Sequence, residues 1–324
     1  MTDALDLRLL DEFQRDLPLV PQPFAAMGEA LGIAEVEVIA RLAALHEAGR
    51  ITRVGATCRP NTAGASTLAA MRVPAARVDE VAGIIGAEPG VNHSYLREDE
   101  WNLWFVATAP DQARLAASLA RIEAAAGVRV LSLPLERAFN IDLGFPLSGP
   151  RRAMALDRPA DMTVLRPDDR ALMQALSSGL PLVARPFAAL ADRFGRDEAE
   201  LIARIGLLLR ARILTRLGVI VRHRALGWRE NAMVVWQMPA DAIPAAGAAL
   251  AGVPGVTLCY QRRTVPGVWD WPLFCMIHGR SRPEALAVLD QARALPELAE
   301  VPHKVLFSTR CFRQRGAVIK EVAA

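Results

Sequence analysis

The strongest constraint on the fold is that the sequence repeats itself. Pro18–Ala26 reappears as Pro181–Ala189, 163 residues further along the chain. The same offset aligns two more ungapped blocks, which are Ile39–Leu42 with Ile202–Ile205 and Ile51–Gly55 with Leu214–Gly218. Self-similarity of this kind marks an internal duplication. The chain is therefore expected to fold as two related units that have diverged.

The repeat continues into the second part of each copy at a slightly larger offset. Pro89–Val91 matches Pro254–Val256, and Tyr95–Arg97 matches Tyr260–Arg262, both 165 residues apart. Small insertions account for the drift. A chain of 324 residues has room for two such copies, each large enough to bury a core of its own.

The first part of each copy is predicted to be a winged helix-turn-helix segment. In the first copy, apolar residues spaced near 3.6 positions apart predict helices at 24–31 and 35–48, the second of which ends at Gly49. A tight connection at 32–34 joins the two helices. Residues 50–58 would then form the strand of a wing.

The second part of each copy is predicted to be a ferredoxin-like domain, in which strands and helices follow the order β-α-β-β-α-β. The strands include 66–73, 101–108, 232–238 and 273–278, and the helices are expected near 78–86, 110–125, 242–250 and 282–294. The fold class is α+β. It is a tandem duplication of a winged helix-turn-helix segment followed by a ferredoxin-like domain.

This organisation divides the chain into five segments. They are a winged helix-turn-helix segment at 1–62, a ferredoxin-like domain at 63–147, a linker rich in Pro and Arg at 148–163, a second winged segment at 164–226 and a second ferredoxin-like domain at 227–324.

Composition is that of a globular protein and excludes several classes of function. Apolar residues make up 52% of the chain and charged residues 23%. A net charge of +3 is small for this length, so the pI of 8.9 does not by itself indicate a nucleic-acid surface. The longest uncharged stretch, 242–261, is interrupted by Pro244 and Pro254 and does not read as a membrane span. The first residues lack a basic-then-apolar leader, so we expect a cytoplasmic protein with no membrane partner.

The four cysteines are scattered along the chain, at Cys58, Cys259, Cys275 and Cys311. They form no C-x-x-C pair, and no histidine lies at zinc-finger spacing from them. This pattern predicts free thiols rather than structural zinc, an iron–sulfur cluster or a disulfide framework.

A winged helix joined to a ferredoxin-like domain resembles the feast/famine (Lrp/AsnC-like) transcription regulators, so DNA binding is the first functional hypothesis. The second helix of the motif must then offer basic and polar side chains to the DNA groove. Instead that helix begins with Glu35 and Glu37 in the first copy, and with Glu198 and Glu200 in the second. Phosphates repel such carboxylates, whereas a helix N-terminus favours them. We therefore expect no DNA partner.

Polar and aromatic side chains gather at positions that the apolar periodicity does not require. Asn92–Arg97 is followed by Trp101–Phe105, and its counterpart Cys259–Arg263 is followed by Trp269–Phe274. Four of the six tryptophans fall in these two hairpins, and Tyr and Arg recur in both. Shared ancestry alone can preserve a core Tyr, but it explains an exposed Arg less well. A third cluster, Arg222–Arg224, ends the second wing.

These residue types suit a flat ligand with several carboxylates. Guanidinium groups grip carboxylates through paired hydrogen bonds, and indole faces cover an apolar ring. Near neutral pH a histidine gives or takes a proton, or ligates iron. Ordinary alternatives stay open: the Tyr-Leu-Arg run can be a solvated strand, the tryptophans can be core or interface residues, and Arg222–Arg224 can be a solvated wing.

At these residues the chain resembles the siroheme decarboxylases, in the fused two-subunit form found in biosynthesis of the d-type haem. The resemblance is carried by Asn92–Arg97, by Asn102–Phe105 after it, and by the Thr-Arg-x-Gly wings at Thr52–Gly55 and Thr215–Gly218. It covers about residues 5 to 320 and is specific as a combination.

The resemblance implies that CO₂ is removed from the acetate side chains on carbons 12 and 18 of siroheme, giving 12,18-didecarboxysiroheme. Siroheme is then the substrate, and no separate cofactor and no protein-bound metal are implied. Loss of CO₂ leaves a carbanion equivalent that the macrocycle delocalises, and an acid must protonate the new methyl group. His or Tyr would supply this proton, and Arg would orient the remaining carboxylates.

Two candidate sites follow. The first combines His93, Tyr95 and Arg97, and the second combines Arg222–Arg224 with Tyr260 and Arg262. The candidate catalytic residues are His93, Tyr95, His223 and Tyr260, and the candidate substrate-binding residues are Arg59, Arg97, Trp101, Arg222, Arg224, Arg262 and Trp269. Either His223 or His93 is also a candidate ligand to the siroheme iron.

Neither copy carries both histidines. Leu258 stands at the position equivalent to His93, and Pro60 stands at the position equivalent to His223. Either the two halves pool residues into one pocket or only one half is competent. We favour a single pocket in the half that contains His223, with residues contributed by the other half.

Two other functions remain open at this point. One is an Lrp/AsnC-like DNA-binding regulator, and the other is a tetrapyrrole-binding protein without catalytic activity. Ferredoxin-like domains of this type tend to pair their sheets, so we expect self-paired halves or a homodimer. Other proteins of haem d-type biosynthesis are expected as further partners.

Overall fold

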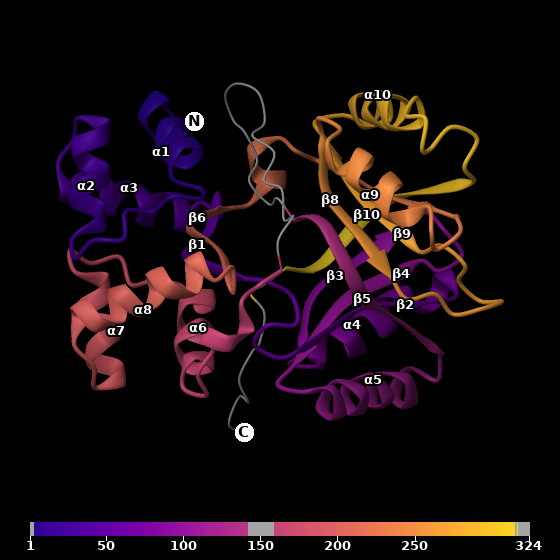
Figure 1. Cartoon of the computed structure of the whole chain (residues 1–324), viewed down its shortest axis with the longest axis horizontal. Helices are drawn as coiled ribbons and strands as arrows, with labels where there is room; N and C mark the ends of the chain where they lie inside the picture. Colours follow the sequence, from indigo (N-terminus) through magenta and orange to yellow (C-terminus); the bar gives the residue numbers. More distant parts are fainter. Residues whose placement is uncertain (1–2, 142–158, 315, 317–324) are drawn as a thin grey trace. The chain divides into compact units, whose positions relative to one another are not determined.

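The computed structural model describes residues 3–141, 159–314 and 316. They form two compact units, and each unit is built from both copies of the repeat (Figure 1). Unit 1 contains the described residues up to Ala63 together with Pro159–Leu226, and unit 2 contains those from Gly64 to 141 and from Gly227 onward. Most of the expected linker, 148–158, lies outside the described residues.

Unit 1 contains one three-helix segment from each copy. These helices are α1 (Ala4–Glu12), α2 (Pro23–Leu31), α3 (Glu35–Glu47), α6 (Asp169–Ser178), α7 (Pro186–Phe194) and α8 (Glu198–Arg210). Pro23 and Pro186 begin α2 and α7, where a missing N–H costs no helical hydrogen bond. Gly32 and Gly195 end the same helices with φ of 74° and 61°, a conformation that favours glycine. The expected helix-turn-helix is confirmed in both copies.

The two wings pair with each other. Strands β1 (Ile51–Cys58) and β6 (Leu214–Val221) form an antiparallel two-stranded ribbon. The glycines of the Thr-Arg-x-Gly motif let another segment approach this ribbon closely. A Cβ atom at Gly55 would lie 2.4 Å from the carbonyl oxygen of Leu176, and one at Gly218 would lie 2.4 Å from that of Gln14. The motif is thus partly structural, since no other residue fits there.

Unit 2 contains the β-α-β-β-α-β order twice, as the sequence predicts. The first copy provides β2 (Ala65–Met71), α4 (Val78–Ala87), β3 (Val91–Arg97), β4 (Leu103–Ala109), α5 (Gln112–Ala126) and β5 (Val130–Ile141). The second provides β7 (Glu230–Trp236), α9 (Ile243–Ala251), β8 (Val256–Arg262), β9 (Leu273–Gly279), α10 (Arg282–Arg293) and β10 (His303–Gln314). The α+β tandem duplication is confirmed.

The eight strands of unit 2 close into one barrel, in the order β10-β3-β4-β2-β5-β8-β9-β7. Closure depends on β5 and β10, which are long enough to serve both copies. The first half of β5 pairs with β2 of its own copy, and the second half pairs with β8 of the other. In the same way, β10 pairs first with β7 and then with β3. The two copies are therefore joined by main-chain hydrogen bonds at two seams.

Three apolar cores follow from the alternation of side chains along these strands. Helices α4 and α5 cover one sheet face of the first copy, and α9 and α10 cover the matching face of the second (Figure 1). The third core is formed by residues of both copies, among them Trp104, Leu133, Val235, Phe274 and Leu306. Residues on the third-core face of the strands therefore lie where the two copies meet.

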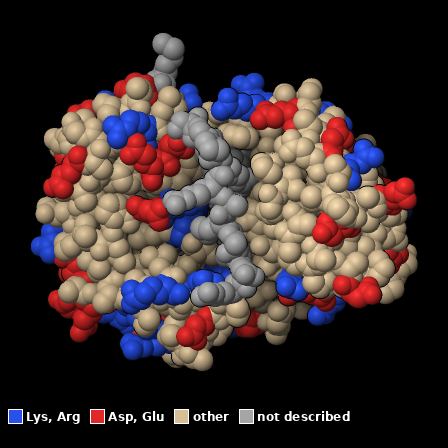
Figure 2. All heavy atoms as spheres, turned by 45° about the horizontal axis from the view of Figure 1, so that its top comes forward, with Lys and Arg blue, Asp and Glu red and all other residues tan. Residues whose placement is uncertain are grey.

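The one face of the molecule drawn in Figure 2 carries charges of both signs. On the face shown in Figure 2, Lys and Arg side chains are interspersed with Asp and Glu. No helix in the described part of the chain has the length and apolar character needed to cross a bilayer. All four cysteines are free, as expected. Within the described ranges, no group of three His, Cys, Asp or Glu side chains is arranged to hold a metal ion.

Candidate functional site

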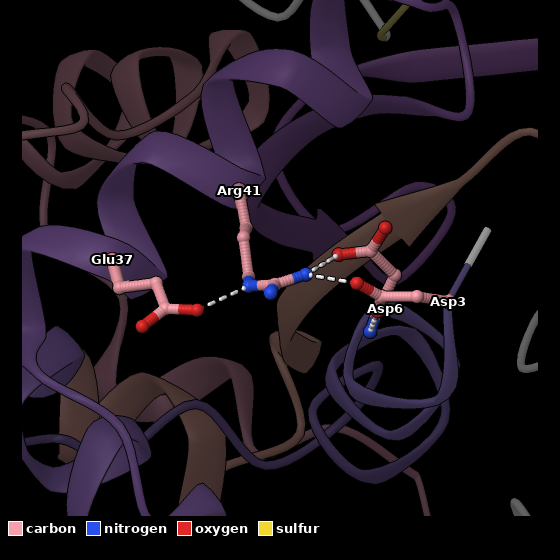
Figure 3. Close-up of polar contacts among 4 residues, drawn as sticks. All are labelled: Asp3, Asp6, Glu37 and Arg41. Carbon is pink, nitrogen blue, oxygen red and sulfur yellow. Dashed lines mark hydrogen bonds and ion pairs between the residues drawn. The ribbon is translucent and has the colours of Figure 1, made fainter. Parts of the chain in front are cut away.

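Arg41, on the second helix of the first helix-turn-helix, forms ion pairs with three carboxylates. Arg41 Nη1 lies 2.7 Å from Asp3 Oδ2 and 2.9 Å from Asp6 Oδ1, and its Nε lies 2.9 Å from Glu37 Oε1 (Figure 3). These contacts raise the pKa of Arg41 above its ordinary value, with the hydrogen bond to Asp3 as the largest cause. The guanidinium fixes α3 to α1 rather than facing a groove.

The second copy repeats this ion pair in a buried form. Arg204 and Asp169 follow Arg41 and Asp6 by the same 163 residues, and Arg204 Nε donates to Asp169 Oδ1 at 2.8 Å. The side chain of Asp169 is fully buried and that of Arg204 is 7% exposed. In both copies, therefore, an arginine on the second helix of the motif holds two helices together. This geometry supports the expectation that DNA is not the partner.

The first candidate site is brought together on strand β3. His93, Tyr95 and Arg97 are alternate residues, so their side chains share one face of the strand. The rings of His93 and Tyr95 are parallel to within 8°, with centroids 6.4 Å apart. The Arg97 guanidinium carbon lies 5.5 Å from the centroid of the Tyr95 ring. An imidazole, a phenol and a guanidinium thus form one continuous row.

Arg97 is not the exposed arginine that the sequence suggested. It is 6% exposed, and it donates from Nη1 to the carbonyl of Leu306 at 2.9 Å and from Nη2 to Asn231 Oδ1 at 3.0 Å. The expectation of exposure is wrong for Arg97, because its side chain is held by β10 and β7 of the other copy. The repeat could not show this, since these strands come from the distant part of the chain.

The equivalent row on β8 reads Leu258, Tyr260 and Arg262. The Arg262 guanidinium carbon lies 5.1 Å from the Tyr260 ring centroid, and Arg262 Nη1 donates to the carbonyl of Leu133 at 2.9 Å. Arg262 stays partly exposed, and no carboxylate contacts it among the described residues. Burial lowers the pKa of Arg262 to about 10 and raises the pKa of Tyr260 above its usual value. An arginine held in apolar surroundings without a counter-ion favours an anionic ligand.

The tryptophans of the two hairpins belong to the third core. Trp269 is 1% exposed and meets Trp104 edge to face at 5.1 Å, and Trp101 is 7% exposed. Neither Trp101 nor Trp269 presents an open ring face as the wall of a ligand site. Of the two roles that the sequence left open, the structure shows the core role for both. Their apolar area is buried where the copies meet.

The remaining candidates belong to unit 1. Arg59 and Arg222 follow the two wing strands at equivalent positions: the Arg59 main-chain N–H donates to Ile213 and that of Arg222 to Arg50. The Arg222 side chain is exposed, whereas Arg59 is half-buried and its pKa is lowered by burial and by nearby Arg212. Arg224 lies in the short 3₁₀ helix η3 (His223–Leu226), which His223 begins. The pooling of these residues with Tyr260 and Arg262 stays a prediction.

The sequence did not indicate that Asn231 and His278 lie beside Arg97. Asn231 bonds Arg97 directly, and its amide nitrogen lies 2.9 Å from His278 Nε2. Asn231 reads as an ordinary strand residue, and His278 lacks a histidine at the equivalent position of the first copy. Only the exchange of strands between copies places them beside Arg97, and no local pattern signals that exchange.

Comparison with known proteins agrees with this architecture. The family described as siroheme decarboxylase NirDL-like HTH domain matches residues 6–51 and 169–214, and the AsnC-like ligand binding domain matches 63–140 and 225–313. The chain is 75% identical over 322 residues to the siroheme decarboxylase NirDL subunit of Paracoccus denitrificans (strain Pd 1222), covering 99% of each chain.

Two further relatives bear on the site and on the duplication. The siroheme decarboxylase NirD subunit of Stutzerimonas stutzeri is 52% identical over 148 residues, which are 46% of this chain and 97% of that protein. A crystal structure of the siroheme decarboxylase NirDL in complex with an iron-uroporphyrin III analogue superposes with a TM-score of 0.66 at 26% identity, covering 97% of this chain and 93% of that one. The chain belongs to the siroheme decarboxylase family.

Proposed function

We propose that this chain decarboxylates siroheme at the acetate side chains on carbons 12 and 18 and releases 12,18-didecarboxysiroheme. The observation that carries the proposal is the match to a siroheme decarboxylase over the whole length of both chains. The related structure that holds an iron-uroporphyrin III analogue supports a tetrapyrrole as the ligand class. Siroheme is the substrate, and the proposal includes no separate cofactor.

The row on β3 is proposed to deliver protons. In each decarboxylation the bond between the methylene carbon and the carboxylate carbon breaks, CO₂ leaves, and the electron pair stays on the methylene carbon. One proton must then reach that carbon, and no net oxidation or reduction occurs. His93 and Tyr95 both carry transferable protons and lie side by side. Arg97 supplies a fixed positive charge beside Tyr95, which stabilises negative charge on the phenol oxygen as its proton leaves.

Arg262 is proposed to bind a substrate carboxylate. The Arg262 side chain is partly exposed, and its Nη1 donates to the carbonyl of Leu133. Its buried Nε has no hydrogen-bond partner among the described residues. A carboxylate brought to this guanidinium would neutralise a cation whose burial is otherwise uncompensated. Tyr260 beside it is held in its protonated form and can donate a hydrogen bond or a proton.

The basic residues of the wing ribbon are proposed to contribute further carboxylate contacts. Arg59, Arg222 and Arg224 follow the ends of β1 and β6, and a substrate with many carboxylates needs several cations. His223 is retained as a second proton donor or as a ligand to the siroheme iron, with His93 as the alternative ligand. Trp101 and Trp269 support the site from the third core.

A cytoplasmic location and self-paired halves complete the proposal. Cys259 and Cys275 lie directly opposite each other on β8 and β9, and both thiols are free, as is usual in a reducing compartment. The ferredoxin-like sheets pair within one chain, which favours self-pairing over a homodimer formed through those sheets. Other proteins of haem d-type biosynthesis are proposed as further partners.

Anaerobic incubation with siroheme tests the proposal. Products lighter by one and then two CO₂ are expected by mass spectrometry, together with release of CO₂. Intact siroheme with a shifted absorption spectrum would instead identify a tetrapyrrole-binding protein without activity. Retarded migration of promoter DNA at physiological salt, with siroheme unchanged, would identify a regulator.

A further inference from the structure

A chain of buried polar side chains connects Arg97 to three strands of the second copy. Arg97 Nη2 donates to Asn231 Oδ1 at 3.0 Å, Asn231 Nδ2 lies 2.9 Å from His278 Nε2, and His278 Nδ1 lies 2.8 Å from Thr257 Oγ1. All four side chains are at most 6% exposed. They lie on β3, β7, β9 and β8 in turn.

Arg97 fixes the direction of each hydrogen bond in this series of buried polar side chains. A guanidinium only donates, so Asn231 must turn its oxygen to Arg97 and its amide nitrogen to His278. His278 Nε2 then accepts, which places the ring proton on Nδ1, where it donates to Thr257. The Thr257 hydroxyl donates onward to the carbonyl of Met276 at 3.0 Å. Every link therefore runs from donor to acceptor, with His278 neutral.

Different polar residues stand at the equivalent positions of the first copy. Strand register places Ser66 at the position of Asn231 and Thr108 at the position of His278. Thr108 Oγ1 lies 3.1 Å from Asn92 Oδ1 and 3.2 Å from the carbonyl oxygen of Gly90. Arg262 stays partly exposed, and the one described hydrogen bond of its guanidinium goes to the carbonyl of Leu133. The series of polar side chains beside Arg97 thus distinguishes its surroundings from those of Arg262.

We infer that Asn231 and His278 are positioning residues, which hold Arg97 against the Tyr95 ring and thereby keep the imidazole–phenol–guanidinium row aligned for proton delivery. The inference rests on the proposed function of that row. A long arginine side chain has many rotamers, and the carbonyl of Leu306 fixes only one of its nitrogen atoms. Asn231 fixes the second nitrogen, and His278 fixes the orientation of Asn231. Misplacement of a reacting group by about 1 Å can cost on the order of 10²-fold in rate.

Paired substitutions at Asn231 separate positioning from packing. Asn231→Leu removes both hydrogen bonds of the amide while filling a similar volume. Asn231→Asp keeps an acceptor for Arg97, and His278 can turn a protonated Nε2 toward the new carboxylate. We expect Asn231→Leu to lower kcat for CO₂ release by about 10- to 100-fold. Asn231→Asp is expected to keep kcat within about 3-fold of the parent chain, because Arg97 stays held.

A second pair at His278 tests the outer link. Gln places an amide oxygen near the position of Nε2, so His278→Gln retains an acceptor for Asn231, whereas His278→Leu does not. We expect the Leu variant to lose turnover as Asn231→Leu does and the Gln variant to retain most of it. Thr108→Val is the matched control, because it removes the equivalent polar side chain of the first copy, whose hydrogen bonds do not involve Arg97.

The measurements are kcat, the Kd for siroheme from absorbance titration, and the thermal unfolding midpoint of each full-length variant. Loss of kcat in both Leu variants, with Kd within about 3-fold and rescue by Asp and Gln, supports positioning. Equal loss within each pair, or unchanged turnover in both Leu variants, overturns it. If the parent chain itself leaves siroheme intact, the proposed function fails, and this outcome is separate from failure of the inference. Where a Leu variant has a lowered thermal unfolding midpoint, the conclusion is drawn from the kcat of the Asp or Gln variant at the same position.

Discussion

Arg97 and Arg262 each donate a hydrogen bond from Nη1 to the main chain of the other copy, at 2.9 Å to Leu306 and at 2.9 Å to Leu133. The two contacts are related by the duplication, since Arg97 pairs in register with Ser308 on β10 and Arg262 with Leu135 on β5. Beyond this shared contact the arginines differ. Arg97 is held by Asn231, whereas Arg262 is partly exposed.

His93 and Leu258 occupy equivalent positions in the two copies, and exchanging them tests which half delivers protons. His93→Leu gives the first copy the residue that the second has at Leu258. We expect this variant to lose about 10²- to 10⁴-fold in turnover, the usual contribution of a positioned acid. Single-turnover CO₂ release under anaerobic conditions measures the loss. Leu258→His is the matched partner, and a normal rate in His93→Leu would exclude His93 as the donor.

Removing the charge of Arg262 is expected to weaken substrate binding. Arg262→Met loses a charge-assisted hydrogen bond worth about 1.5–3 kcal/mol, so Kd for siroheme should rise about 10- to 100-fold. Absorbance titration gives the affinity. Arg263→Met is the control, because Arg263 is exposed and is paired only with Glu136 across 3.6 Å among the described residues. Equal affinity of the Arg262 and Arg263 variants would contradict the assignment.

The two equivalent ion pairs of unit 1 should contribute unequally to stability. Asp169→Asn leaves Arg204 buried without its counter-ion and should lower the unfolding free energy by about 3–5 kcal/mol. Asp6→Asn acts on a pair whose side chains are 18–22% exposed, and Arg41 keeps Asp3 and Glu37, so a loss of at most about 1 kcal/mol is expected. Urea unfolding of both variants measures the difference. Similar losses would refute the argument from burial.

Alkaline conditions should destabilise the barrel through Cys275. Burial raises the pKa of this thiol from 9.0 to about 12, so the folded chain keeps a proton that the unfolded chain releases above pH 9. The contribution of this thiol to the unfolding free energy should therefore be constant below pH 9 and fall as pH rises from about 9 to 12, by at most about 1.4 kcal/mol per pH unit. Cys275→Ala should show a shallower fall in urea unfolding. Parallel curves for the two proteins would rule out this contribution.

The two halves should assemble when they are made as separate chains. Strands β5 and β10 each complete the sheet of the other copy, so residues 1–150 and 151–324 are expected to co-purify as a one-to-one complex. The NirD subunit of Stutzerimonas stutzeri is a separate protein that matches 46% of this chain over 97% of its own length, which is the reason to divide the chain into halves. Size-exclusion chromatography with light scattering gives the stoichiometry. Two halves that purify separately as monodisperse monomers would show that the seams are dispensable.

Local periodicity was enough to predict most elements of this fold. The helix expected at 78–86 is found at Val78–Ala87, and the strand expected at 273–278 is found at Leu273–Gly279. The pairing of β5 with β8 and of β10 with β3 was not predicted, because main-chain hydrogen bonding leaves no pattern in side chains. The repeat indicated that the halves would pair but not which strands would cross.

The sequence was enough to predict which candidate side chains lie together where those residues are near neighbours along the chain. The row of His93, Tyr95 and Arg97 follows directly from alternation along one strand. Burial could not be predicted where it depends on distant segments: Trp269 in a hairpin has the same sequence context whether its ring packs against Trp104 or against a ligand. Burial of Arg97 likewise depends on β10, which lies some 200 residues away along the chain.

The closed barrel has a consequence for how such a protein can diversify. Pairing of strands at the two seams uses peptide groups, which every sequence possesses, so side chains along the seams can change while the main-chain pairing is kept. One half can then lose a histidine, and the other can gain buried polar side chains, while the two halves stay together. Because every strand of the described barrel is already paired on both sides, a stray copy finds no place to add its own strand. Covalent linkage keeps the two specialised halves at equal dosage in every molecule.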